Sequence, residues 1–157
     1  MMNRWMETRD YAKAVLMGLL GSLFLAIVML AWQQSGLSPF PEALPLAFVR
    51  SIFGPTTELG VGIFLHTVWI TFWTVMFVVI YRRRTFADAC VLALWLWLTA
   101  LFVFCPLAGW GFYGTRVSPL VPLAMLVPHV LFAVSAWGLA RWLIPRGSLR
   151  PLPASTA

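Results

Sequence analysis

Apolar residues occupy four long blocks of the chain, separated by polar or proline-rich segments. The blocks run over residues 14–32, 59–81, 86–105 and 119–143. A helix needs about 20 apolar residues to cross a bilayer, and no block carries a charged residue in its middle. The pattern predicts an all-α integral membrane protein, a four-helix bundle made of two helical hairpins in a single domain.

The segment between the first two blocks, residues 33–58, is the longest non-spanning stretch and is rich in proline. Within it, residues 42–53 are apolar apart from their ends, and Gly54-Pro55 follows directly. Glycine and proline after an apolar run are typical of a helix end. We therefore expect a short interfacial helix over residues 42–53, on the outer membrane surface.

Composition supports a lipid environment. The chain is 61% hydrophobic and only 10% charged, whereas soluble domains carry about 25% charged residues. The net charge of +6 does not indicate nucleic acid, because the basic residues fall between the apolar blocks rather than along one face.

Basic residues predict the orientation. Nine of the eleven lie on the side that holds both termini and the connection between the second and third blocks, and only Arg50 and Arg116 lie on the other. The positive-inside rule then places both termini in the cytoplasm, in a multi-pass protein of the bacterial inner membrane. Within the connection, Arg82, Arg83 and Arg84 determine this topology; binding of anionic lipid headgroups is the alternative role.

Aromatic residues at the block ends are expected to anchor the helices in the two membrane interfaces. On the outer side these are Trp32, Trp110, Phe112 and Tyr113, and on the inner side Trp5, Tyr11, Tyr81 and Trp142.

Small and hydroxylated residues recur at helical spacing in three blocks. The residues are Ala14, Gly18, Ser22 and Ala26 in the first, Thr67, Thr71 and Thr74 in the second, and Ala133, Ala136 and Ala140 in the fourth. In lipid, such residues let helices approach closely. The stripes are explained by packing within one bundle, or alternatively by docking onto other membrane subunits or onto a second copy of the chain.

The only histidines, His66 and His129, both fall inside apolar blocks. An ionisable residue within a membrane usually faces the bundle interior and is a functional hypothesis by default. Their depths, about 10 Å and about 15 Å inside their helices, could match within about 5 Å. Three interpretations are open: hydrogen bonds between helices, a proton or small-polar-ligand site, and haem b with one histidine from each helix as axial ligands.

No set of residues indicates catalysis. The sequence contains no P-loop, no glycine-rich dinucleotide motif and no Cys-x-x-Cys, and its carboxylates are divided between the two sides of the membrane. We interpret the chain as non-enzymatic.

Three stretches resemble the YagU-type family of bacterial inner-membrane proteins. They are FLHTVWITFWTVMFVVIY (64–81), LFVFCPLAG (101–109) and PHVLFAVSAWGLAR (128–141). In that family a histidine opens the second of these helices, a Pro-Leu-x-Gly ends the next, and a histidine opens the last. The resemblance covers about 80 residues, although this chain has a much shorter first outer loop. It implies a membrane protein associated with acid resistance, with His66 and His129 as the residues carried over.

These observations give three functional hypotheses. The first is acid tolerance or proton handling through the two histidines; the others are a haem-b electron carrier and an accessory subunit of a larger membrane complex.

Overall fold

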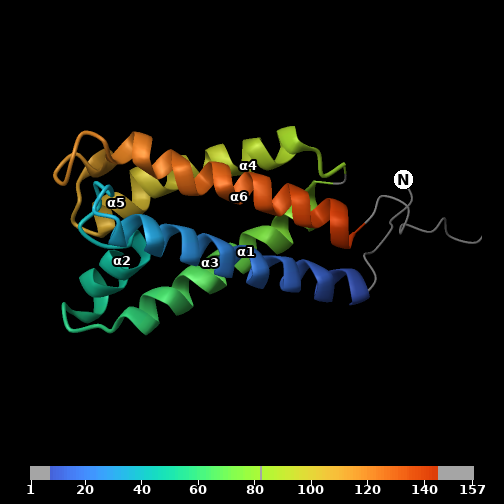
Figure 1. The fold of residues 1–157 in the computed structure, drawn as a ribbon, viewed down its shortest axis with the longest axis horizontal. Coiled ribbons are helices and arrows are strands. Elements are labelled where there is room, and N and C mark those ends of the chain that lie inside the picture. The colour runs from blue at the N-terminus through green and yellow to red at the C-terminus, as the bar shows by residue number, and fades with distance from the viewer. Residues whose placement is uncertain (1–7, 82, 145–157) are drawn as a thin grey trace, which may run out of the picture.

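The computed structural model describes residues 8–81 and 83–144 of the chain. Every long element in these ranges is a helix. Four long helices form two antiparallel hairpins, which confirms the predicted all-α four-helix architecture (Figure 1). The elements are α1 (Thr8–Gln34), α2 (Leu44–Phe53), α3 (Leu59–Ile80), α4 (Phe86–Thr99), the π-helical segment η1 (Ala100–Phe104), α5 (Cys105–Leu107), the short 3-10 turn η2 (Phe112–Gly114) and α6 (Val121–Leu143).

Four of these helical stretches are long and apolar enough to cross a membrane. They cover Arg9–Gln34, Leu59–Ile80, Phe86–Leu107 and Val121–Leu143, the third being α4 continued through η1 and α5. Their outward surfaces carry large apolar side chains, such as Phe64 at 70% and Leu123 at 68% exposure. A soluble protein rarely exposes so much contiguous apolar surface, and the chain is accordingly a multi-pass membrane protein.

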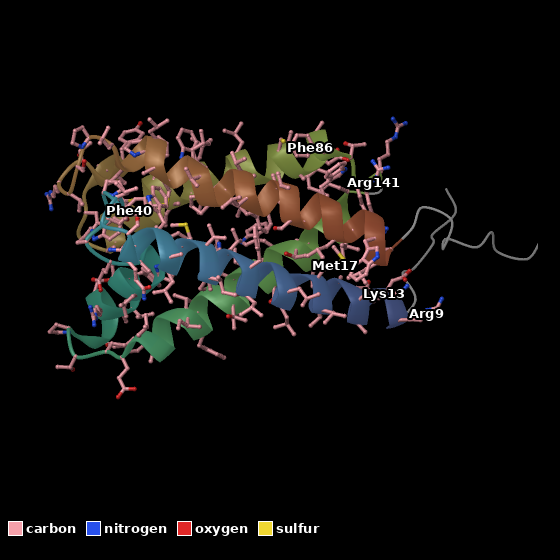
Figure 2. The ribbon with its side chains drawn as sticks, in the orientation of Figure 1. Arg9, Lys13, Met17, Phe40, Phe86 and Arg141 are labelled. Atoms are coloured by element: carbon pink, nitrogen blue, oxygen red, sulfur yellow. The ribbon has the colours of Figure 1, made fainter. Side chains whose placement is uncertain are left out.

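The long helices pack as two pairs, α1 with α3 and α4 with α6, and α1 also contacts α6 across the middle (Figure 1). We call the end of the bundle where α1 begins, α6 ends and α3 connects to α4 the terminal end, and the opposite end the loop end. The completely buried Met17 and Phe77 lie in the core of the terminal half. Arg9, Lys13 and Arg141 gather at the terminal end, whereas Phe40 lies at the loop end (Figure 2).

Helix α4 begins with a capping box at a short turn. The Thr85 hydroxyl accepts a hydrogen bond from the Asp88 backbone N–H at 3.2 Å, and the Asp88 carboxylate accepts one from the Thr85 N–H at 2.8 Å. Two of the free N–H groups at the helix start are thereby satisfied. This cap fixes the point at which the chain re-enters the bundle after α3.

Helix α2 closes the loop end of the α1–α3 pair. Its side chains Leu46, Ala47 and Val49 are buried, and Leu46 sits directly on Gly62 of α3. Arg50 holds the helix to its flanks by pairing with Glu42 and by donating to the Thr57 carbonyl at 3.2 Å. The expected short helix therefore exists and packs against the bundle with one face, while Ile52 and Phe53 remain exposed.

Trp110, expected among the outer interfacial aromatics, is packed inside the loop end instead of facing outward. Its ring is only 6% exposed and stacks on Phe40 at 6.0 Å between centroids, while Trp32 meets Phe40 edge-on at 5.8 Å. These three rings join α1, its following loop and the segment after α5 into a small aromatic core at the loop end. Phe112 and Tyr113 are exposed as anticipated, and Trp5 lies outside the described residues.

Candidate functional site

Helices α1 and α3 approach each other closely at Gly18. A methyl group added at Gly18 would lie 2.5 Å from the Cα of Thr71, a distance that real atoms do not adopt. The two backbones can therefore meet here only because Gly18 has no side chain. This contact brings the polar residues of α3 against those of α1.

One turn further along α1, a hydrogen bond joins the two helices. The Ser22 hydroxyl donates to the Thr67 hydroxyl at 3.1 Å, and Ser22 is almost completely buried. Thr74, in contrast, donates back to the Ile70 carbonyl of its own helix at 2.8 Å. Thr67 thus links α1 to α3, while Thr74 is satisfied locally.

His66 lies at the same contact, with its imidazole beside the backbone of Ser22. Its Nε2 is buried and has no hydrogen-bond partner among the described residues, and the same holds for the Thr71 hydroxyl. An unpaired buried polar atom destabilises a protein by about 1–3 kcal/mol. We call Ser22, His66, Thr67 and Thr71 the α1–α3 polar cluster, because all four lie where α1 meets α3 and two of them have a buried polar atom without a partner among the described residues.

His129 is bound differently, within the α4–α6 pair. Its Nδ1 lies 2.7 Å from the Met125 carbonyl, one turn earlier in the same helix. A carbonyl only accepts, so Nδ1 carries the hydrogen. The ring also lies beside the backbone of Leu96 in α4. This histidine therefore has a partner in its own helix and a polar neighbour in the next.

Helix α4 departs from regular α-helix beside His129. The Ala100 N–H is shared between the Leu96 and Trp97 carbonyls, and the Cys105 N–H bonds to the Ala100 carbonyl five residues earlier. Pro106 explains this π-helical segment, because its ring clashes with the carbonyl one turn earlier and removes one N–H from the ladder. Pro106 is visible in the sequence, where it belongs to the Pro-Leu-x-Gly that is expected to end the helix. The proline does not by itself predict a π-helical segment before it.

A tryptophan that sequence reasoning assigned no role ties α4 to α6. Trp97 Nε1 donates to the Pro122 carbonyl at 3.0 Å. Few side-chain hydrogen bonds cross between helices in this structure, and this one and the Ser22–Thr67 bond serve the two different pairs. The sequence offers no pattern that would distinguish Trp97 from the other tryptophans.

The structure places the two histidines on different helix pairs. His66 faces α1, and His129 is held by α6 and lies against α4. Axial ligation of one haem iron requires two imidazole nitrogens that face each other. The contacts of the described residues place the two rings against different helices and do not support a haem-b site. In the described ranges 8–81 and 83–144, no group of three or more His, Cys, Asp or Glu side chains could hold a metal ion.

The small residues singled out from the sequence lie mainly inside the bundle. Gly18 and Ser22 are buried against α3, and Ala133, Ala136 and Ala140 of α6 are at most 2% exposed, whereas Ala26 is only half-buried. Helices of the same chain cover these stripes. Of the three arginines in the α3–α4 turn, Arg83 is exposed, Arg84 is half-buried, and Arg82 lies outside the described residues.

Comparison with known proteins gives no family assignment. A scan against family models found no match, and searches of curated proteins and of solved structures found no similar protein. The resemblance to the YagU-type family is therefore a prediction, and the function has to be argued from the geometry.

Proposed function

We propose that this chain is a non-enzymatic protein of the bacterial cytoplasmic membrane that responds to protons through His66. The observation that carries the proposal is the buried Nε2 of His66, which has no hydrogen-bond partner among the described residues although the ring lies beside the Ser22 backbone in the α1–α3 polar cluster. Histidine is the side chain whose charge changes most readily near neutral pH. Protonation would add a donor and a positive charge where α3 packs against Ser22 of α1.

The distribution of basic residues supports an orientation for this site. Arg83, Arg84 and Arg141 lie at the terminal end of the bundle, and the positive-inside rule then assigns that end to the cytoplasm. His66 lies seven residues from the start of α3, about 10 Å along the helix from the loop end. In this orientation His66 lies in the outer half of the membrane, where protons arrive from outside the cell.

The charge would act on the helix contact itself. Beside the fixed polar groups of Ser22 and Thr67, an imidazolium introduces a desolvated charge, which is costly in a membrane unless it is paired or hydrated. No carboxylate lies in α1 or α3 at this depth to pair with it. We therefore expect protonation to loosen the α1–α3 contact rather than to tighten it.

A pH titration of the purified full-length chain tests the proposal. Intrinsic tryptophan fluorescence is followed in detergent from about pH 8 to about pH 4, because Trp69 and Trp73 follow His66 on the same helix. Wild type and His129→Asn are expected to share one transition that His66→Asn lacks. A transition that persists in His66→Asn, or that only His129→Asn abolishes, would contradict the proposal.

A cellular experiment then links the site to physiology. Cells that depend on the chain for survival in acid are expected to lose survival with His66→Asn and to keep it with His129→Asn, provided that both variants insert in equal amounts. Equal survival of the two variants would contradict a role in acid tolerance through His66.

A further inference from the structure

Residues 42–57, which include α2 at the loop end, form a unit whose polar bonds are internal (Figure 1). The Arg50 guanidinium pairs with the Glu42 carboxylate and donates to the Thr57 carbonyl at 3.2 Å. The Thr57 hydroxyl and backbone N–H both donate to the Gly54 carbonyl. Every hydrogen bond and ion pair that the described residues give this segment joins two of its own members. We call residues 42–57 the α2 unit.

Apolar packing holds the α2 unit on the bundle. Leu46 lies on Gly62 of α3, where a methyl group added at Gly62 would be 3.0 Å from the Leu46 Cα. Phe48 meets Phe104 edge-on at 5.1 Å, and Phe104 meets Trp69 in the same way. Apolar contacts between helices have little hydrophobic driving force where lipid is the alternative neighbour. The α2 unit can therefore separate from α3 without breaking a hydrogen bond.

The contacts of the α2 unit with α3 lie on both sides of His66. Gly62 precedes His66 by one turn, and Trp69, which the unit reaches through Phe104, follows it by three residues. Residues three or four apart are neighbours on one side of a helix. Nε2 of His66 is buried, so bulk water does not reach this nitrogen while the α2 unit is in place. A proton reaches it only after a neighbouring element moves.

The other elements around His66 are joined more firmly. Helices α1 and α3 meet at Gly18 and share the Ser22–Thr67 hydrogen bond. The α2 unit, in contrast, is flanked by the exposed Pro41 and Glu58. Exposed positions at the ends of an element can absorb the change in backbone angles that a movement requires. Of these elements, the α2 unit is the one that can move as a body.

Charged groups do not tie the α2 unit to His66. Glu42 and Arg50 of the unit pair with each other, and Glu58 at the N-cap of α3 is exposed. Residues 14–34 of α1, 59–80 of α3 and 100–104 of η1 contain no titratable group other than His66. Water that enters between the α2 unit and α3 therefore changes the charge of His66 and of no other group in these helices.

We propose that the α2 unit is a lid that opens as one body and admits water from the loop end to His66. This inference rests on the proposed proton response of His66 and assigns the step that controls it. With the lid closed, the imidazole keeps its charge when the pH at the loop end changes. With the lid open, it exchanges protons with the water. Gly62 permits the closed position, because a larger residue there would press on the Leu46 backbone.

Thiol labelling tests the lid without any protonation step. His66→Cys is placed in a full-length chain that carries Cys90→Ala and Cys105→Ala, and its reaction with a charged, water-soluble maleimide is followed in detergent. Gly62→Ala pushes the lid from α3 and is expected to raise the labelling rate at least about five-fold, because overpacking destabilises the closed position. Gly60→Ala is the matched control and should leave the rate unchanged, since nothing lies within 4 Å of a methyl group there.

A second labelled position separates opening of the lid from general loosening of the bundle. Ala133→Cys, at a site of α6 that is 2% exposed, replaces His66→Cys in the same background. Its labelling rate should not respond to Gly62→Ala. An equal rise at both positions would overturn the proposal, and so would equal rates at position 66 in Gly62→Ala and Gly60→Ala.

A pH jump connects the lid to the proton response. In chains that keep His66, tryptophan fluorescence is followed after a rapid shift from about pH 8 to about pH 5. Gly62→Ala should speed the His66-dependent change, and Gly60→Ala should not. Equal rates in the two variants would overturn the lid as the controlling step. If the wild type shows no such change, the proton response itself is wrong, whereas the labelling rates still decide whether the α2 unit opens.

Discussion

The two helix pairs of this protein each contain one histidine, and the two histidines differ in their hydrogen bonding. In the α1–α3 pair, His66 lies beside Ser22, one turn along α1 from Gly18, and its Nε2 has no partner among the described residues. In the α4–α6 pair, His129 donates to the Met125 carbonyl, and Trp97 binds the Pro122 carbonyl nearby.

This difference separates a structural histidine from a candidate functional one. A buried polar group that is fully hydrogen-bonded stabilises the fold. An unpaired one lowers the free energy of unfolding, and other interactions have to compensate for that loss. An unsatisfied group in a native protein is explained by strain, by a catalytic role, or by an ordered water or ion that binds it. By this criterion the α1–α3 pair holds the candidate site that we propose, and the α4–α6 pair supports it.

The largest expected effect breaks the α1–α3 contact. Gly18→Ala should lower the free energy of unfolding by about 1–3 kcal/mol, because the new methyl group meets the Thr71 backbone. Gly138→Ala is the matched control on α6, where nothing lies within 4 Å, and should stabilise by up to about 1 kcal/mol through helix propensity. Sodium dodecyl sulfate titration, followed by circular dichroism, measures both; equal effects would contradict the close contact.

Exchanging each histidine for an apolar ring of similar size tests the comparison directly. His129→Phe should lower the free energy of unfolding by about 1 kcal/mol, since it removes a hydrogen bond inside the membrane. His66→Phe should leave stability unchanged or raise it, because it removes an unpaired polar atom. The same titration measures the change in the free energy of unfolding for both variants. A larger loss of stability in His66→Phe than in His129→Phe would show that His66, not His129, is the structural histidine.

The indole hydrogen bond of the α4–α6 pair should have a smaller effect. Trp97→Phe loses the donor to the Pro122 carbonyl and should destabilise by up to about 1 kcal/mol more than Trp95→Phe, a neighbouring substitution at a ring that is 62% exposed. Unfolding titrations of the two variants are compared. Indistinguishable curves would show that the Trp97 bond adds no stability to this pair.

The smallest expected effect concerns the hydroxyl pair of the α1–α3 contact. A double-mutant cycle of Ser22→Ala and Thr67→Ala should give a coupling energy of about 0.6 kcal/mol, the usual size of such bonds between membrane helices. A cycle of Thr67→Ala with Ser135→Ala should give none, because the Ser135 hydroxyl donates to the Phe132 carbonyl of its own helix. A coupling of equal size in both cycles would rule out a specific Ser22–Thr67 interaction.

The sequence predicts the number and approximate bounds of the helices because lipid imposes a simple rule. A spanning helix must be apolar all round, and such blocks are visible without knowledge of their neighbours. The spacing of Gly18 and Ser22 likewise places them on one helix face. Which helix covers that face, however, depends on rotations that an apolar sequence leaves undetermined.

The partners of the histidines were beyond sequence reasoning for the same reason. His66 and His129 have similar depths and similar apolar neighbours, yet one turns to α1 and the other lies against α4. The environment of Trp110 is also difficult to predict from the sequence. An aromatic residue at the end of a span is equally typical of an interfacial anchor and of a packed loop. Only the fold of the loop end brings Phe40 onto its ring.

The π-helical segment Ala100–Phe104 makes the bundle sensitive to chain length at one point. A segment of this kind holds one residue more than a regular helix would, so deletion of a single residue here would restore the α-helical ladder. Everything beyond it would then turn by about 100° around the helix axis. Phe104, which meets Phe48 and Trp69 edge-on at 5.1 Å each, would point elsewhere, and Cys105 would leave the core. One inserted residue thus sets the angular register between the terminal half of the bundle and the cap that closes its loop end.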